Sequence, residues 1–307
     1  MNFRKQILSC ALALIPACGV FAQSSESLGF VRIGQNAALQ GTAGAAFTSA
    51  QSPAWGSMGD ITATLDSESK LAAGLGYNLW SATGTSYASA GVSYRASDRL
   101  AFALSGVYGL EKSYDIYNES GAKKGMFTPS QMYVSVGAAY RVLPMLSLGV
   151  NLHGASETLA EGQSYSAFSA DVLVSAHFSG LKATAGVVSL GSKVKDAAGN
   201  AFSLPGSVKL AAGYEGCSLG ILSYGAYLDS DYYPASGTLG LSVGGSLGYQ
   251  DLVAFRAGYH YGSGKCVIPS YGSIGLGGGF KGLSLDLAYL FGGQISGTLA
   301  VSLGYRF

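Results

Sequence analysis

Three histidines, His153, His177 and His260, are the side chains of this sequence best suited to acid–base chemistry near neutral pH. Asp171 and Asp286 could orient such a base, as the third group of a Ser–His–acid arrangement does. However, no G-x-S-x-G motif occurs where a strand–turn–helix could present the serine, and no histidine–cysteine cluster has metal-ligand spacing. The sequence therefore predicts a protein that is not an enzyme and has no metal or cofactor.

The elements that carry these residues alternate in character from about Lys70 onward. Segments of about ten residues place large apolar side chains on one face and small or polar ones on the other, which is typical of transmembrane barrel strands. The last segment shows the pattern most clearly, because one face carries Leu299, Val301, Leu303, Tyr305 and Phe307. The pattern predicts an all-β fold, a transmembrane antiparallel β-barrel.

Composition supports a barrel whose outer face meets lipid. Charged residues make up 11% of the chain, whereas soluble domains have about 25%. After the first two dozen residues no run of 18 apolar residues occurs, so no spanning helix is expected. Backbone groups in lipid must be satisfied internally, and a closed barrel achieves this with strands. The chain also lacks the basic stripe that nucleic-acid binding requires, so no nucleic-acid partner is expected.

Applied along the chain, the template predicts about 14 strands. Their expected ranges are 69–79, 85–95, 100–112, 126–141, 145–156, 164–178, 181–190, 206–215, 218–228, 238–249, 252–262, 270–280, 283–291 and 297–307. The connections after even strands are short, whereas 113–125, 157–163, 191–205, 229–237 and 263–269 are longer. The even strand count and these lengths place both termini of the barrel chain and the short turns on the periplasmic side, and the long loops outside.

Aromatic residues mark the ends of almost all even strands and predict a periplasmic aromatic girdle. Its members are Tyr94, Tyr140, Phe178, Tyr214, Tyr249, Phe280 and Phe307. An outer girdle would comprise Tyr77, Trp80, Tyr108, Tyr227, Tyr259, Tyr261, Tyr289 and Phe291. The same topology separates Cys217, in a periplasmic turn, from Cys266, in an outer loop. No disulfide is therefore expected between them.

The first 22 residues have the pattern of a signal peptide. Arg4 and Lys5 precede the apolar stretch Ile7–Ile15, and Ala22 ends a cleavage site. The alternative is a lipoprotein signal cut before Cys18, although a proline lies within that site. The domains expected are thus a signal peptide (1–22), an N-terminal hatch or plug (23–66) and an outer-membrane β-barrel (67–307).

Residues 23–66 are predicted to fill the lumen, because they do not alternate and are rich in Ala, Gly, Ser and Thr. The inward faces of the strands are also lined with small residues, which leaves room for such a segment. The lumen-facing candidates are His153, Asp171, His177, Lys209, Arg256, His260, Asp286 and Arg306, together with Glu215. Inward charges in barrels commonly pair with each other or with a plug; the alternative is a role in gating or ligand contact.

The stretch from Phe30 to Phe47, FVRIGQNAALQGTAGAAF, resembles the start of the PorV/PorQ family of Bacteroidetes outer-membrane proteins, a branch of the FadL-like fourteen-stranded barrels. That family opens with an apolar–Arg–apolar step, an Ala/Gly-rich run and then an Asn-Pro-Ala-Gly step. In this sequence the place of the Asn-Pro-Ala-Gly step is taken by Ser52-Pro53-Ala54-Trp55-Gly56, in which the Asn is missing. The resemblance covers the N-terminal segment loosely and the barrel by architecture.

The resemblance implies two functions for an outer-membrane barrel. PorV/PorQ-like members support type IX-like protein secretion or surface assembly, with secretion-system or cargo proteins as partners and the loops 113–125 and 191–205 as contacts. FadL-like relatives are passive channels that take up hydrophobic small molecules through the barrel wall. The small lumen lining favours the first function. A continuous apolar pocket beside the hatch would favour the second, and a purely structural barrel is a third hypothesis.

Overall fold

The computed structural model describes residues 27–307 except 118–120, 161, 196–200, 219 and 251. The expected signal peptide, with both of its alternative cleavage sites, lies outside the described residues. Among the helices described, none is long and apolar enough to cross a membrane.

Fourteen antiparallel strands form one closed barrel, in which each strand pairs with its sequence neighbour and the first with the last. The strands are β1 (Leu71–Trp80), β2 (Thr85–Ser97), β3 (Leu100–Leu110), β6 (Ser130–Leu143), β7 (Leu146–Ala160), β8 (Gln163–Phe178), β9 (Leu181–Gly191), β12 (Ser207–Ser218), β13 (Leu222–Tyr233), β14 (Thr238–Tyr249), β15 (Val253–Gly262), β16 (Tyr271–Phe280), β17 (Leu283–Phe291) and β18 (Thr298–Arg306). β1 closes the barrel against β18, with Leu75 opposite Leu303. The predicted architecture and strand count are confirmed.

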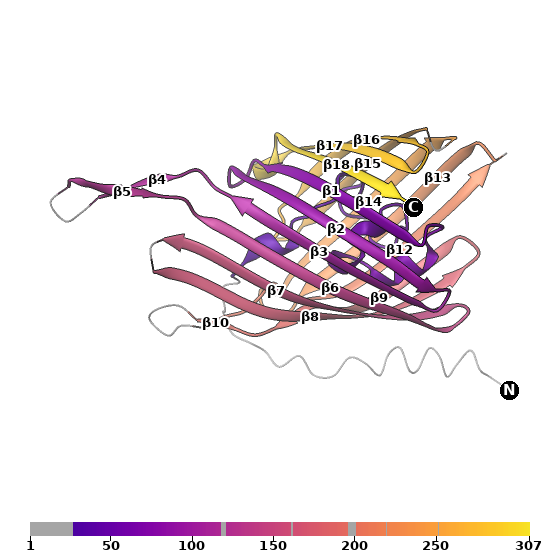
Figure 1. The fold of residues 1–307 in the computed structure, drawn as a ribbon, viewed down its shortest axis with the longest axis horizontal. Coiled ribbons are helices and arrows are strands. Elements are labelled where there is room, and N and C mark those ends of the chain that lie inside the picture. The colour runs from indigo at the N-terminus through magenta and orange to yellow at the C-terminus, as the bar shows by residue number, and fades with distance from the viewer. Residues whose placement is uncertain (1–26, 118–120, 161, 196–200, 219, 251) are drawn as a thin grey trace.

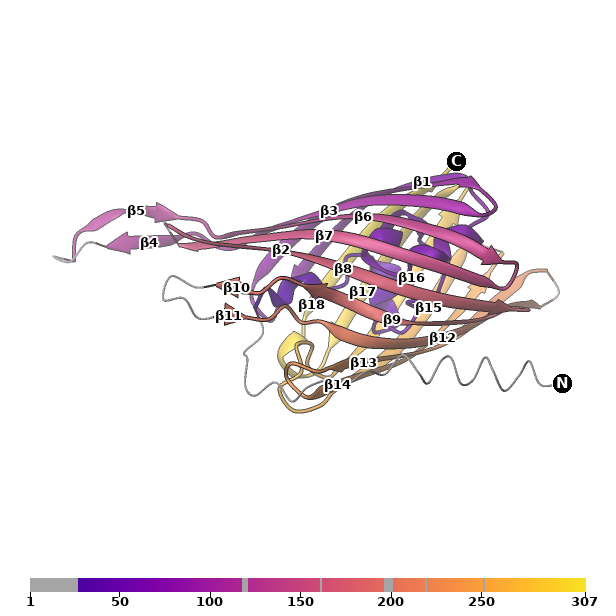
Figure 2. The same cartoon turned by 90° about the horizontal axis from the view of Figure 1, so that it is seen from below.

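Two short hairpins extend beyond the barrel at its outer end (Figures 1 and 2). One joins β4 (Tyr114–Tyr117) to β5 (Lys123–Phe127), and the other joins β10 (Val194–Lys195) to β11 (Ala201–Phe202). The strand predicted at 126–141 therefore begins later, at Ser130. Pro129 explains the break, because proline cannot donate to a strand ladder.

Two outer connections are shorter than predicted. The strand pairing of β7 with β8 continues to Ala160 and Gln163, so most of the loop predicted at 157–163 belongs to these two strands. β13 likewise runs to Tyr233 and pairs with Thr238, which absorbs most of the loop predicted at 229–237. Backbone pairing continues past the apolar band because strand hydrogen bonds do not depend on which side chains face outward.

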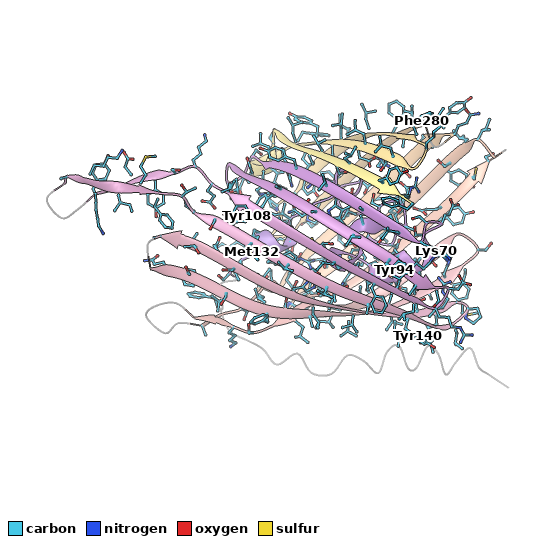
Figure 3. All side chains as sticks on the ribbon, in the orientation of Figure 1. Lys70, Tyr94, Tyr108, Met132, Tyr140 and Phe280 are labelled. Atoms are coloured by element: carbon cyan, nitrogen blue, oxygen red, sulfur yellow. The ribbon has the colours of Figure 1, made fainter. Side chains whose placement is uncertain are left out.

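Large apolar side chains cover the outside of the barrel, as expected for a lipid-facing surface. The seven residues of the predicted periplasmic girdle are all exposed: Tyr94, Tyr140, Phe178, Tyr214, Tyr249, Phe280 and Phe307. In Figure 3, Tyr94, Tyr140 and Phe280 lie toward the barrel end opposite the projecting β4–β5 hairpin. The protein is thus an integral, multi-pass outer-membrane β-barrel.

The outer girdle was predicted incorrectly at two positions. Trp80 and Tyr227 are 6% and 3% exposed and face the lumen, whereas the other six predicted members are exposed. On β1 the inward positions are the even-numbered ones, so the aromatic ring at position 80 points inward although its type suits an interface. Side-chain parity, rather than residue type, decides the face.

A charge on the lipid face should destabilise the barrel according to its depth. Val243, in the middle of β14, is 56% exposed, and we expect Val243→Arg to cost about 2–4 kcal/mol of unfolding free energy in lipid. Leu252→Arg, next to the periplasmic turn, should cost about 0–1 kcal/mol and serves as the control. Denaturant unfolding in lipid vesicles measures both; equal costs would contradict a membrane-spanning β14.

Candidate functional site

The N-terminal segment, residues 27–66, lies inside the barrel (Figures 1 and 2). It contains η1 (Gly29–Arg32), α2 (Ala37–Gly41), η2 (Pro53–Met58) and η3 (Ile61–Asp66). α2 packs against β15 to β18, whereas η2 and η3 pack against β1 to β3 and β6 to β8. The segment therefore contacts much of the inner wall.

Inward glycines allow this close packing. A Cβ at Gly74 would overlap the ring of Trp55, and a Cβ at Gly91 would overlap the carbonyl of Ala54. Ser105 on β3 adds hydrogen bonds, because it contacts Ser57 Oγ at 2.8 Å. The small lumen lining that the sequence shows is thus occupied by the segment rather than left empty.

An apolar cluster lies at the outer end of the segment. Leu28 and Phe30 are buried against wall residues that include Trp80, Tyr87 and Leu290. The segment is also tied to the outer connection between β9 and β12, since Ser27 N donates to Ser203 O at 2.9 Å.

A cavity of about 190 Å³ runs between the N-terminal segment and the strands. Its apolar lining includes Phe30, Phe47, Trp55, Trp80, Val107, Val188 and Leu290. Its polar lining includes Arg32, Asp171, Lys209, Asp229, Asp231, Arg256 and His260. This cavity is the candidate functional site.

Two cations and two carboxylates form a buried cluster on one side of the cavity. Lys209 on β12 contacts Asp229 Oδ1 at 2.8 Å and Asp231 Oδ2 at 2.7 Å, both on β13. Arg32 of the N-terminal segment contacts Asp231 Oδ1 at 2.7 Å and donates to Tyr233 Oη. Burial disfavours the charged form of Arg32, but Tyr233 and Asp231 outweigh it and hold the pKa of Arg32 above its ordinary value. We call these four residues, Arg32, Lys209, Asp229 and Asp231, the charge cluster.

Asp171 lies at an irregularity in the wall. β9 carries an extra residue opposite it, and Ser189 in this bulge has a left-handed φ of 55°. The carboxylate accepts from Ser189 N at 2.7 Å and from Asn151 at 3.1 Å, and it lies 2.9 Å from His153 Nε2. Asp171 thus accepts the hydrogen bond of the Ser189 N–H, which the bulge leaves without a partner on the neighbouring strand.

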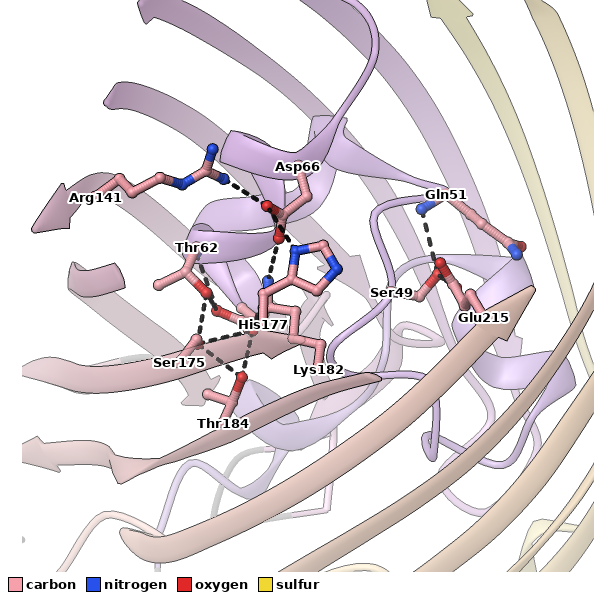
Figure 4. Close-up of polar contacts among 12 residues, drawn as sticks. Ser49, Gln51, Thr62, Asp66, Arg141, Ser175, His177, Lys182, Thr184 and Glu215 are labelled. Atoms are coloured by element: carbon pink, nitrogen blue, oxygen red, sulfur yellow. Dashed lines mark hydrogen bonds and ion pairs between the residues drawn. The ribbon is translucent and has the colours of Figure 1, made fainter. Parts of the chain in front are cut away.

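The periplasmic end of the segment is held by a second set of ion pairs (Figure 4). Asp66 contacts Arg141 on β6, Lys182 on β9 at 3.1 Å and His177 on β8 at 3.6 Å. Asp60, whose side chain is fully buried, lies 3.4 Å from Lys182 and accepts from Thr184 at 2.7 Å. These contacts tie η3 to three different strands.

The remaining candidates from the sequence also lie along the segment. Arg256 contacts Asp286 at 2.7 Å and donates to Gln51 of the segment at 3.3 Å. His260 is hydrogen-bonded to Ser242 at 2.8 Å, and Glu215 accepts from Ser49 at 2.6 Å. The contacts of Arg256 with Gln51 and of Glu215 with Ser49 join the wall to the segment, whereas His260 and Asp286 contact other strands of the wall.

Six of the eight lumen-facing candidates have buried side chains in the barrel: His153, Asp171, Lys209, Arg256, His260 and Asp286. The other two, His177 and Arg306, occupy inward positions at the periplasmic rim and are exposed. Sequence reasoning missed several of their partners: Arg32, Asp60, Asp66, Arg141, Lys182, Asp229 and Asp231. Asp229 and Asp231 were assigned to an outer loop; their i, i+2 spacing continues the alternation of β13 and could have revealed them.

The two cysteines of the described chain lie at opposite ends of the barrel. Cys217 is near the periplasmic end of β12, and Cys266 is in the outer connection between β15 and β16; neither is paired in a disulfide. Among the described residues, no group of three or more His, Cys, Asp or Glu side chains could hold a metal ion.

No protein-family model and no curated protein matches the sequence. Solved structures do match. The Ralstonia pickettii toluene transporter TbuX has a TM-score of 0.58 at 11% identity, covering 89% of this chain and 98% of that one. The CymD monoaromatic hydrocarbon channel has a TM-score of 0.59 at 15% identity, covering 92% and 99%. A Pseudomonas aeruginosa FadL homologue has a TM-score of 0.55 at 13% identity, covering 89% and 98%.

The likeness shows a FadL-like barrel fold. These neighbours are named as transporters, channels or FadL homologues, and they extend over nearly the whole of both chains. The PorV/PorQ branch expected from the N-terminal stretch does not appear among these neighbours.

Proposed function

We propose that the protein is a passive channel that carries hydrophobic small molecules across the outer membrane. The observation that carries this proposal is the cavity between the N-terminal segment and the strands, with its apolar and aromatic lining. Ligand sites of this kind combine a largely apolar lining with a few fixed polar groups. The toluene transporter and the monoaromatic hydrocarbon channel of the same fold support it.

The size of the cavity favours compact molecules. Its volume is about 190 Å³, whereas drug-sized ligands occupy pockets of about 300–1,000 Å³. An engineered protein cavity of about 150 Å³ binds benzene. A ligand with a single aromatic ring therefore fits the resting cavity, whereas a long acyl chain would require the N-terminal segment to move.

Blocking the cavity should abolish transport. Val107 on β3 points into the cavity, and we expect Val107→Trp to reduce uptake of radiolabelled toluene to the vector background, because the indole occupies the ligand space. The assay uses cells of a Gram-negative host that carry the full chain in the outer membrane. The intact protein should raise the uptake rate several-fold above cells with an empty vector.

The matched control lies on the same strand. Leu104 on β3 is 49% exposed on the lipid face, so Leu104→Trp should leave toluene uptake unchanged. Unchanged uptake in Val107→Trp would contradict transport through this cavity. No difference between the intact protein and the empty vector would defeat the channel proposal itself.

A second candidate function is protein interaction in secretion or surface assembly, as the PorV/PorQ resemblance implies. The observation that favours it is the β4–β5 hairpin, which projects from the outer end and exposes Tyr114, Tyr117 and Met126. Removing residues 114–127 should then change the secreted and surface proteome and leave toluene uptake intact. An unaltered secreted and surface proteome after this deletion would rule out the second candidate function.

A further inference from the structure

Each lysine and arginine side chain that lines the cavity in the described chain is paired with a carboxylate. In the charge cluster, Asp231 lies 2.7 Å from both Arg32 and Lys209, and Asp229 lies 2.8 Å from Lys209. Arg256 is paired with Asp286, and Asp60 with Lys182, whereas Asp171 accepts hydrogen bonds from Ser189 N and Asn151. The cavity thus has charged groups within its largely apolar lining, but the described lining residues include no unpaired lysine or arginine.

The two lining cations of the charge cluster have little capacity for another anion. The side chains of Lys209 and Arg32 are only 6% and 10% exposed. Asp229 and Asp231 occupy one face of the Lys209 ammonium, and the ring of Phe47 lies 4.4 Å from its nitrogen. A carboxylate could reach Lys209 only by displacing one of these groups.

The buried polar atoms without a partner in the described cavity lining are all uncharged, so they supply no counter-ion for an anion. Two of them in the cavity lining are the side-chain oxygens of Gln35 and Gln40, which can only accept hydrogen bonds. The indole N–H of Trp55, a donor, and the hydroxyl of Thr64, which can donate or accept, are also without a partner in this lining. Carbonyl oxygens repel a carboxylate, whereas a neutral molecule meets no electrostatic penalty from them.

From these contacts we infer that the cavity selects uncharged molecules and rejects carboxylates of the same size. This inference rests on the proposed channel function, because it concerns the ligand of that channel. An anion in the cavity would be desolvated without a counter-ion, and burial of an uncompensated charge is strongly unfavourable. The substrate class is thus neutral aromatic or aliphatic compounds, and benzoate-like or fatty-acid anions are excluded.

The test compares toluene with benzoate, which have the same ring and a one-carbon substituent and differ in charge. The chain contains two tryptophans, Trp55 and Trp80, and both line the cavity, so their fluorescence reports on occupancy. In titrations of the purified full chain in detergent near neutral pH, toluene should bind about 100-fold more tightly than benzoate or better. Comparable affinities for the two ligands would overturn the inference and leave the channel proposal standing.

A gain-of-function variant sharpens the test. Asp231→Asn keeps the shape of the side chain and removes the carboxylate that Arg32 and Lys209 share, so the ratio of benzoate affinity to toluene affinity should rise by about tenfold. Asp115→Asn removes an ion pair with Lys123 in the outer hairpin and should change neither affinity. Asp286→Asn, which releases Arg256, is a second variant should Asp231→Asn fail to assemble.

The outcomes separate the two proposals. If neither ligand alters the fluorescence and neither is taken up by cells, the channel function is overturned and the inference with it. If toluene binds and Asp231→Asn or Asp286→Asn gains no benzoate affinity, paired charges are not the source of selectivity and the inference is overturned. Selective toluene binding with a gain of benzoate affinity in the variants supports it.

Discussion

Asp60→Ala should release the periplasmic end of the N-terminal segment and raise the ion conductance of the barrel. Asp60 accepts hydrogen bonds from Thr62 N at the start of η3 and from Thr184 on β9, and it lies 3.4 Å from Lys182. Its side chain is fully buried, and loss of one partner of a buried ion pair costs about 3–5 kcal/mol. The contacts of Asp60 hold the start of η3 against β9, so their loss should release this end of the segment from the wall.

Single-channel recordings in planar bilayers measure the conductance, and limited proteolysis reports on exposure of residues 27–66. Asp98→Ala is the matched control, because Asp98 is at the same end of the barrel and its side chain is 95% exposed beside Arg95. Such an exposed pair contributes about 0–1 kcal/mol. If Asp60→Ala conducts like the intact protein and resists protease equally, η3 is not held by these ion pairs.

Gly258→Leu should displace the middle of the N-terminal segment from the wall. Gly258 on β15 faces the lumen, and a Cβ there would overlap the carbonyl group of Thr42 and the backbone nitrogen of Ala43. Backbone atoms cannot rotate away as a flexible side chain does, so the segment must shift. Overpacking of this kind costs about 1–3 kcal/mol or more.

Gly106→Leu makes the same substitution on the lipid-facing side of β3, where a Cβ would meet no atom within 4 Å. We expect it to behave like the intact protein in denaturant unfolding and in proteolysis of the segment, whereas Gly258→Leu unfolds earlier and is cleaved. Similar behaviour of the two variants would mean that the segment does not pack against β15 as the structure describes.

The barrel was predictable because alternation repeats in every strand. In β18, Leu299, Val301 and Leu303 face outward and Thr298, Ala300 and Ser302 face inward, as a period of two requires. Errors arose where the type of a side chain suggests one face and its position in the strand gives the other, as at Trp80. They also arose where strand pairing extends beyond the alternating apolar pattern, as in the loop predicted at 157–163.

The candidate site was only partly predictable. Lys209, Arg256 and Asp286 could be placed on the inward face from parity alone, but their roles depend on partners that are far away in the sequence. Arg32 and Asp231 are 199 residues apart and form an ion pair only because the N-terminal segment passes β13 inside the barrel. No local pattern encodes such a contact.

The sequence by itself determined the location of the protein, the strand topology and the face on which most side chains lie, because these follow from local alternation and from the need to satisfy every backbone group in lipid. Only the tertiary structure decided which lumen charges neutralise each other and how much space remains between the segment and the wall. Those properties depend on distances between distant parts of the chain. They also decide the two features from which ligand selectivity is inferred, the volume of the cavity and the absence of an unpaired cation among its described lining residues.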